Sequence, residues 1–506
     1  MTEKTLGIEE SIREIGEKLE RTKAELAKAE EEFEEALRRH FHASMWRNLK
    51  RDEIGKFVRR PYFVQPLKEG EGWRLFVPRF IPLEVGWLEY QDESFNVFRV
   101  SMWVDWLKGI PDVLKWDLGM EKPEFDLQFD WEKGILQVQK GEPDEVKRKY
   151  GKFIHRRLNH GMFQIKSPQR FSFLVQLLRD GVLPHPPKPV SPDDLSPREP
   201  FELRDYQREA LEYFLRYSHI GVFYPFGAGK SYFGVYMIGR VNGRKLVVVP
   251  TRTLVELWRK RIEELCPDEL GQTEIITYHS LHKVRQKEYS LVIIDECHHA
   301  PADTFSQVFF IKRKYTLALS GSPYREDGRT ELLFTLGYPI GADWSYFFKL
   351  GIVRKPSVTV IVLARHEDKF FEVKRLLKEP LVTLIYCDGI ERGKRLSSRL
   401  GCPFVFSETR RRLDEINEAL DNNGYVVLSR VGDEGVSLPA IQRIIEYDFL
   451  FGSRRQEVQR VGRLFHATEA GEHYILMTQD ELARYKKRLY SLVEKGIEIK
   501  WDVRGA

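Results

Sequence analysis

A glycine-rich segment that ends in a lysine and a serine has residue types and a spacing that could bind phosphate. Gly227-Ala228-Gly229-Lys230-Ser231 follows an apolar run at 221–224 and precedes a helical stretch at 232–240. Glycines before a helix let backbone N–H groups surround phosphate oxygens. A lysine at this spacing pairs with the β- and γ-phosphates, and a serine hydroxyl binds Mg²⁺. We therefore expect a nucleoside triphosphate with its metal to be bound by Gly227, Gly229, Lys230 and Ser231.

A pair of adjacent carboxylates favours this interpretation over a simple glycine turn before a core helix. That alternative exists because Tyr224 stands where the strict phosphate-loop pattern has a glycine. Asp295 and Glu296 come directly after the apolar run at 291–294, about 65 residues beyond Lys230. A carboxylate at a strand end binds Mg²⁺, usually through water, and its neighbour polarises the attacking water. We expect Asp295 and Glu296 to be metal ligands, with Glu296 also catalytic.

Two histidines, His298 and His299, follow the acidic pair. Adjacent histidines point in different directions, so a zinc site is not expected here. We expect one of them to bridge to the next motif along the chain. The four cysteines form no CxxC pair, which also disfavours a zinc ribbon or a disulfide scaffold.

The elements that must position these residues alternate between strand and helix. Apolar runs at 221–224, 247–249 and 291–294 are separated by helical segments, which is typical of a parallel α/β domain. A second α/β domain begins near residue 355, with buried strands predicted at 382–387 and 426–428. The glycine-rich segment and the acidic pair each lie at a strand end.

The first 200 residues divide by composition into four segments. Apolar residues at helical spacing predict a helical or coiled-coil arm over 1–50, and short apolar runs predict a strand-rich domain over 51–140. Residues 141–183 are rich in lysine and arginine and predict a basic helical extension, and 184–200 form a proline-rich linker. The basic extension could contact phosphates, or it could be a solvated face over an ordinary helical core.

The overall composition excludes some classes of protein. The chain has 506 residues with 81 Lys and Arg against 76 Asp and Glu, a formal charge of +5. This balance excludes a histone-like or strongly acidic protein, so any nucleic-acid site must depend on where basic residues lie. No run of about 18 apolar residues occurs, and the start of the chain has no apolar signal core, so we expect a cytoplasmic protein without a membrane partner.

Further motifs follow one another in a recognisable order. They are Leu203-Arg204-Asp205-Tyr206-Gln207, Pro250-Thr251-Arg252, Thr277-Tyr278-His279-Ser280, Ser320-Gly321-Ser322-Pro323, Arg325-Glu326-Asp327, Val431-Gly432-Asp433-Glu434-Gly435-Val436 and Gln459-Arg460-Val461-Gly462-Arg463. With the glycine-rich segment and the acidic pair, they resemble the motifs of superfamily 2 helicases and translocases. The resemblance is strongest to the XPB-like branch and covers about residues 201–475.

The resemblance implies a fold and a set of cofactors. The fold is α/β, with two tandem RecA-like domains of parallel sheets flanked by helices, here 201–350 with the ATP site and 351–506 with the arginine finger. An α+β region with a long helical arm precedes them. ATP and Mg²⁺ are the implied cofactors. Besides the glycine-rich segment, the implied nucleotide contacts are Arg204, Gln207, Gly432 and Asp433.

The resemblance also assigns catalytic and nucleic-acid contacts. Arg463 is the expected arginine finger, which stabilises charge on the γ-phosphate in the transition state, with Arg460 and Gln459 beside it. The implied nucleic-acid contacts are Thr251, Arg252, His279, Ser280, Arg325, Glu326 and Asp327. Two features depart from the family pattern: His466 replaces its closing arginine, and little room exists for the thumb insertion that XPB proteins carry.

The function that the resemblance implies is an ATP-dependent DNA helicase or double-stranded DNA translocase. It would remodel DNA or displace bound complexes such as stalled RNA polymerase, in transcription termination or DNA repair. Double-stranded DNA is the expected partner, with RNA polymerase or another protein contacting the N-terminal region. Two alternatives remain open: an RNA helicase or remodeller, and an ATP-gated clamp that binds DNA without travelling along it.

Overall fold

The computed structural model of the chain divides into two units, Met1–Glu121 and Lys122–Ala506. It describes residues 21–25, 28, 62–67, 72–79, 81, 85, 87–91, 95–100, 114–115, 118, 125–130, 133–180, 195–197, 199–321, 330–341, 344–429, 441–448, 454–466 and 471–504. Among the described helices, none has the length and apolar composition needed to cross a membrane.

The first unit contains an antiparallel sheet of four strands in the order β1-β2-β4-β3. These strands are β1 (Phe63–Pro66), β2 (Trp73–Pro78), β3 (Trp87–Gln91) and β4 (Phe95–Val100). Leu75 and Val77 on β2 alternate with less buried residues, as expected of a sheet with one face in a core. Residues 21–25 and 28 are helical, while the rest of the predicted arm lies outside the described residues.

Two pairs of strands, each followed by a helix, form the first part of the second unit, which corrects the prediction of a basic helical extension over residues 141–183. Its elements are β5 (Asp126–Asp130), β6 (Ile135–Lys140), α6 (Pro143–Tyr150), β7 (Ile154–Asn159), β8 (Met162–Ile165) and α7 (Arg170–Arg179). The sheet order is β5-β6-β8-β7, so the expected boundary at residue 140 falls inside one folded region. The aromatic residues of this region come from separate strands and helices. Phe173 on α7 gathers Phe129, Tyr150 and Phe153 into one core, with ring centroids 5.0–5.5 Å away.

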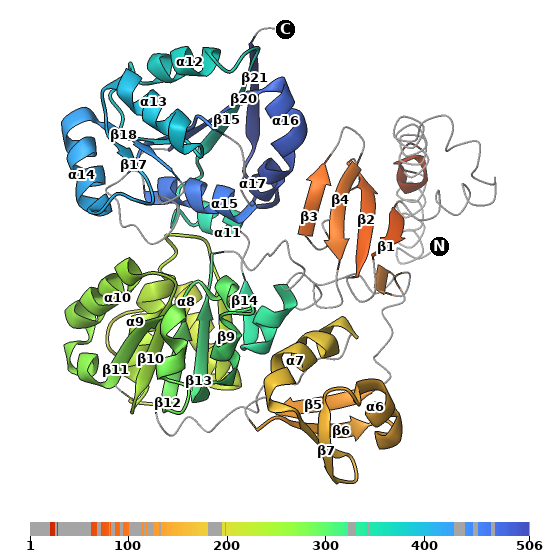
Figure 1. Cartoon of the computed structure of the whole chain (residues 1–506). Coiled ribbons are helices and arrows are strands. Elements are labelled where there is room, and N and C mark those ends of the chain that lie inside the picture. The colour runs from red at the N-terminus through yellow and green to blue at the C-terminus, as the bar shows by residue number, and fades with distance from the viewer. Residues whose placement is uncertain are drawn as a thin grey trace, which may run out of the picture. The chain divides into compact units, whose positions relative to one another are not determined.

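The first α/β lobe is a parallel sheet in the order β11-β10-β12-β13-β9-β14. Its strands and longer helices are α8 (Asp205–Tyr217), β9 (His219–Phe223), α9 (Lys230–Arg240), β10 (Lys245–Val249), α10 (Arg252–Leu265), β11 (Thr273–Thr277), β12 (Glu288–Ile294), β13 (Lys312–Leu319) and β14 (Tyr338–Gly341). Every residue of β9 and β10 is buried, as expected of strands covered on both faces by helices (Figure 1).

The second α/β lobe is also a parallel sheet, in the order β17-β18-β16-β19-β20-β15-β21. The elements from residue 344 onward are α11 (Trp344–Lys349), β15 (Ser357–Leu363), α12 (Asp368–Leu376), β16 (Thr383–Tyr386), α13 (Ile390–Leu400), β17 (Phe404–Val405), α14 (Arg412–Asn423), β18 (Tyr425–Leu428), β19 (Arg443–Glu446), α15 (Arg454–Gly462), β20 (Glu472–Thr478), α16 (Gln479–Tyr485), α17 (Tyr490–Glu494) and β21 (Ile499–Arg504). Two parallel sheets flanked by helices confirm the predicted α/β class.

Candidate functional site

The glycine-rich segment connects the end of β9 to the start of α9. Gly227 and Gly229 have φ values of 80° and 76°, a conformation that glycine adopts without the steric cost of a side chain. The Lys230 ammonium is buried and donates hydrogen bonds to the backbone oxygens of Tyr224 and Pro225, both at 3.0 Å. Burial lowers the pKa of Lys230, although the charges of Glu296 and Asp295 oppose that shift. The ammonium therefore lies inside the turn that a phosphate group would enter.

The first residues of helix α8 form hydrogen bonds to the backbone of this turn. The Tyr206 hydroxyl donates to the Ala228 carbonyl at 2.8 Å, and the Gln207 side-chain amide donates to the Gly229 carbonyl at 3.1 Å. The Gln207 side-chain oxygen accepts from the Arg204 backbone N–H at 3.1 Å, which caps the helix. Gln207 was expected at the nucleotide, and here it holds the backbone of the segment that would bind phosphate.

The acidic pair lies at the carboxyl end of β12, as predicted. Asp295 is buried, and its two carboxylate oxygens accept from the Trp258 indole N–H at 2.8 Å and the Glu296 backbone N–H at 3.0 Å. Burial raises the pKa of Asp295, while the Trp258 hydrogen bond and the Lys230 charge oppose the rise. Glu296 has a φ of 47°, a left-handed conformation that is uncommon outside glycine. The Tyr278 hydroxyl lies 3.1 Å from the Asp295 carbonyl and 3.3 Å from that of Glu296.

This set of donors fits a hydrated divalent cation. Oxygen ligands from one or two carboxylates and a hydroxyl are what Mg²⁺ uses beside a nucleotide, with water completing its coordination. Asp295 and Glu296 act electrostatically on buried Lys230, so the carboxylates and the ammonium share one small region. Ser231, the second residue of α9, follows the lysine directly. Asp295 and Ser231 are thus the residues that would hold the metal.

Trp258 is a functional candidate that the sequence reasoning missed. It lies on α10, fully buried, and an added Cβ at Gly234 would lie only 2.5 Å from its ring. The missing side chain at Gly234 therefore makes room for the indole, which in turn reaches Asp295. In the sequence Trp258 is visible only as a tryptophan two helical turns after Thr251. That spacing alone does not indicate that its indole bonds to an acidic residue.

His298 confirms the prediction that one histidine bridges to the next motif. Its Nδ1 lies 2.9 Å from the Ser320 hydroxyl at the end of β13 and 3.3 Å from a carboxylate oxygen of Glu296. One imidazole therefore contacts both the acidic pair and the first residue of the Ser320-Gly321-Ser322 motif. Residues 322–329, with the predicted contacts Arg325, Glu326 and Asp327, lie outside the described residues.

Two of the predicted nucleic-acid motifs lie side by side. Strands β10 and β11 are parallel neighbours in which Val249 pairs with Thr277, so the segments that follow both strands leave the same edge of the sheet. Thr251 caps α10 by accepting from the Leu254 backbone N–H at 3.3 Å, and Arg252 beside it is exposed. His279 is also exposed, and Ser280 is half-buried.

The arginines of the last motif occupy different environments. Arg460 is fully buried, donates to Glu446 at 2.7 Å and Asp388 at 3.0 Å, and lies 4.2 Å from the centre of the Tyr386 ring. Arg463, three residues later, is half-buried. Arg460 was expected beside the arginine finger, but its bonds hold it inside the second lobe. Gln459 is buried too, the His466 side chain lies outside the described residues, and so do Gly432 and Asp433.

An arginine finger must lie where it can approach the phosphates. A close contact between Gly462 and Phe226 shows that the last motif lies near the phosphate-binding turn. An added Cβ at Gly462, next to Arg463, would lie 2.6 Å from the ring of Phe226 in the glycine-rich segment. The Phe226 ring also lies 4.9 Å from the Lys230 ammonium. The last motif therefore meets the phosphate-binding turn through Gly462.

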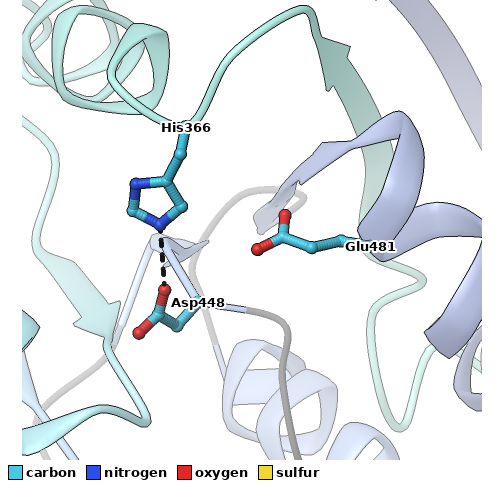
Figure 2. Close-up of side chains that lie close together, drawn as sticks. All are labelled: His366, Asp448 and Glu481. Atoms are coloured by element: carbon cyan, nitrogen blue, oxygen red, sulfur yellow. Dashed lines mark hydrogen bonds and ion pairs between the residues drawn. The ribbon is translucent and has the colours of Figure 1, made fainter.

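A second cluster has ligand atoms spaced closely enough for a metal ion. His366, Asp448 and Glu481 have ligand atoms within 4.8 Å of one another, and Figure 2 shows the 3.4 Å contact between His366 and Asp448. Lys369, however, lies 2.6 Å from Glu481, and Arg392 lies 3.2 Å from Asp448. These cations already neutralise both carboxylates, so the cluster is better explained as an internal ion-pair network.

The fold and the site together define a class of protein, in which two parallel α/β lobes are present and the first carries a phosphate-binding turn and an acidic pair at a strand end. Two family profiles match this part of the chain. Residues 200–325 match "Type III restriction enzyme, res subunit", and residues 377–501 match "ERCC3/RAD25/XPB C-terminal helicase". The second of these matches confirms the resemblance to the XPB-like branch for the second lobe.

Two relatives in sequence carry Rad25 and XPB names. A "Putative DNA 3'-5' helicase Rad25" of Halobacterium salinarum is 29% identical over 368 residues, covering 62% of this chain and 61% of the relative. "DNA 3'-5' helicase XPB" of Mycobacterium tuberculosis is 24% identical and covers 59% of this chain and 65% of the relative. The chain thus spans about three fifths of the length of these relatives. Among solved structures, S. cerevisiae Dbp5 bound to RNA and ADP BeF3 has a TM-score of 0.47 and 13% identity over 59% of this chain and 89% of that one.

Proposed function

We propose that this protein is an ATP-dependent superfamily 2 motor that translocates on, or unwinds, double-stranded DNA. The observations that carry the proposal are Lys230 inside the phosphate-binding turn, the acidic pair at the end of β12 and the His298 contacts that join Glu296 to Ser320. In such a set a change at the phosphates can reach the segments at the edge of the sheet. Relatives named DNA 3'-5' helicases support DNA as the substrate.

Each residue of the set has a distinct part in hydrolysis. The Lys230 ammonium, which here donates to the carbonyls of Tyr224 and Pro225, donates to phosphate oxygens instead when ATP binds. Ser231 and Asp295 would hold the metal, which would supply charge neutralisation at the phosphates of bound ATP. Glu296 orients and polarises the attacking water, and its 3.3 Å contact with His298 links that step to Ser320.

Arg463 is the group that we assign to the transition state. A guanidinium near the γ-phosphate stabilises charge that develops as the phosphoryl group transfers. Arg463 suits the role better than Arg460, because Arg460 is already bonded to Glu446 and Asp388. His466 leaves the site with one fewer permanent cation than the family pattern has.

The finer role that we propose is the displacement of complexes bound to DNA, such as stalled RNA polymerase. Support comes from the organisation of the chain: both family matches lie within residues 200–501, which leaves residues 1–199 available for a partner. Stalled elongation complexes should release their transcript with the wild-type protein and ATP. Equal release by Lys230→Ala would contradict an ATP-driven mechanism.

The rate of ATP hydrolysis with and without nucleic acid tests the main proposal. The wild-type rate should rise with duplex DNA more than with single-stranded DNA or RNA, whereas Lys230→Ala and Glu296→Gln should stay near background with every nucleic acid. Greater stimulation by RNA would favour an RNA remodeller. Displacement of a triplex-forming strand separates a translocase from a stationary clamp, which would hydrolyse ATP and leave the third strand in place.

A further inference from the structure

The positive charge of this chain is concentrated in one small region outside the α/β lobes. Residues 133–180 contain eleven Lys and Arg and four Asp and Glu, a formal charge of +7, whereas the whole chain carries +5. The remaining residues therefore carry a net negative charge. A local excess of this kind is the electrostatic signature of a surface that binds a polyanion.

Strand β7 carries part of this charge in an unusual setting. It lies at the edge of the sheet (Figure 1), and of its six residues only Ile154 is buried. Successive side chains of a strand point to opposite faces, so the exposure of both Arg156 and Arg157 means that the strand is open to solvent on both faces. The register with β8 shifts on either side of this pair. Such irregularities increase the local twist at this edge of the four-stranded sheet.

Helix α6 extends the same basic surface. Arg157 on β7 donates to Asp144 in the first turn of α6 at 2.9 Å, which brings the helix beside the strand. Lys147, Arg148 and Lys149 on α6 are all exposed, and so is Lys152 just after it. The acidic residues within this surface form solvent-exposed pairs, Asp144 with Arg157 and Glu145 with Arg148, which bind only weakly. Lys147, Lys152 and Arg156 have no acidic partner among the described residues.

The aromatic residues of this region favour a duplex over a single strand. Proteins that bind single strands stack bases on accessible aromatic rings. Here Tyr150, Phe153 and Phe163 are buried, and Phe173 packs against Tyr150 and Phe153. With those rings unavailable for stacking, the surface offers cations to phosphates.

The region is attached to the first α/β lobe. Phe171 on α7 packs against Phe309, with ring centroids 5.7 Å apart, and both residues belong to the same unit. A duplex bound on α6 and β7 would therefore be held by the same body that carries the ATP site. We infer that α6 and β7 form a second DNA-contacting surface, one that binds the phosphate backbone of duplex DNA without requiring ATP. This inference goes beyond the proposed motor function, because it concerns residues outside the motor motifs.

Binding of a fluorescently labelled DNA duplex to the full chain, without nucleotide and over a range of salt concentrations, tests the inference. Arg156→Glu with Arg157→Glu should weaken binding at least tenfold and lower the slope of log affinity against log salt by about 2, since each phosphate contact contributes about 0.9. The control, Arg484→Glu with Lys486→Glu at the end of α16, makes the same change of charge at exposed residues elsewhere. Equal affinity and slope in wild type and the Arg156/Arg157 variant would overturn the inference, and so would a loss confined to double-stranded RNA.

A second variant and a second measurement guard against misfolding and against failure of the motor proposal. Lys147→Glu with Lys152→Glu should weaken duplex binding in the same direction, and both variants should keep the wild-type unfolding temperature and the ATPase rate measured without nucleic acid. Lys230→Ala should keep the nucleotide-independent duplex binding even if the motor proposal fails.

The alternative explanation is that Arg156 and Arg157 protect the edge strand, because charged residues on edge strands prevent association between sheets. Arg156→Ser with Arg157→Ser should then associate in size-exclusion chromatography, whereas the glutamate variant should remain as monodisperse as wild type. If the glutamate variant binds duplex normally and only the serine variant associates, edge protection explains the arginines and the inference is wrong.

Discussion

The charged residues of the two α/β lobes are satisfied in opposite ways. In the first lobe, Lys230 bonds to backbone carbonyls and lies near a carboxylate pair that it does not fully neutralise. In the second lobe, Glu446 accepts from Arg460 and Arg488 and lies 3.0 Å from His473, with all these side chains buried. The first arrangement leaves bonding capacity for a ligand, whereas in the second the Glu446 carboxylate is compensated by groups of the protein itself.

This difference separates charged residues that can bind a ligand from charged residues that stabilise the fold. A buried carboxylate is tolerated only when cations and hydrogen bonds compensate for its lost hydration. Although burial alone would raise the pKa of Glu446, Arg460 and Arg488 hold it below its usual range. The same motif thus supplies Arg460 to the core of the second lobe and leaves Arg463 near its surface.

The largest expected effect comes from Arg463. Arg463→Ala should lower the DNA-stimulated ATPase rate about 10³-fold, as expected for an arginine finger, with little change in unfolding temperature. Steady-state kinetics beside a thermal melt gives both values. A rate within a few fold of wild type would show that the arginine finger is another residue.

Arg460 should show the opposite behaviour. Arg460→Ala leaves Glu446 without one of its two arginine partners, and removing one member of a buried ion pair costs about 3–5 kcal/mol of stability. Urea denaturation should detect this loss as an earlier transition of the second lobe. An unchanged transition, with activity lost, would mean that the arginine serves catalysis and that the contrast between the lobes is mistaken.

A substitution at Trp258 tests whether its hydrogen bond to Asp295 supports metal binding in the first lobe. Trp258→Phe keeps most of the packing against Gly234 but removes the N–H that bonds to Asp295. Without that donor the charged form of Asp295 is less stabilised, so binding of Mn²⁺ in the presence of ADP should weaken about tenfold. Electron paramagnetic resonance of the free ion measures this directly. A purely structural tryptophan would instead lower the unfolding temperature and leave the metal affinity unchanged.

The smallest effect should come from Glu457, and it depends on pH. Burial and the nearby charge of Glu446 raise the pKa of Glu457 to about 7, above its value in the unfolded chain. The folded protein therefore binds more protons than the unfolded one between about pH 4.5 and 7, and this residue's contribution to stability falls as the pH rises through that range. Glu457→Gln cannot titrate, so its stability relative to wild type should increase from about pH 5 to about pH 7 and then level off. A difference that is flat across this range would contradict the raised pKa.

The sequence indicated the two α/β lobes because their motifs place chemistry at fixed points of a repeating fold. Asp295 could be assigned to a strand end from four apolar residues before it, and the His298 bridge followed from the directions of neighbouring side chains. The bonds of Arg460 could not be predicted, because Glu446 and Asp388 lie 14 and 72 residues away along the chain. Trp258 was missed for the same reason, since its partner Asp295 lies 37 residues away.

The N-terminal half was harder to predict because its elements are short. Strands β7 and β8 contain six and four residues, and irregular pairing between them obscures the period of two that reveals a strand. Aromatic residues from several elements meet in one core around Phe173, so their spacing along the chain matched no single element. Short strands with non-local partners carry too little local pattern to be recognised.

The pairing of Gly234 with Trp258 also limits how this protein can evolve. Any side chain at Gly234 would occupy the space of the indole ring, and any smaller residue at Trp258 would leave a hole beside Asp295. A substitution at either position alone should therefore lower stability or function. Across related sequences the two positions should change together or not at all, so a variant with alanine at Gly234 should tolerate that change only with a smaller ring at Trp258.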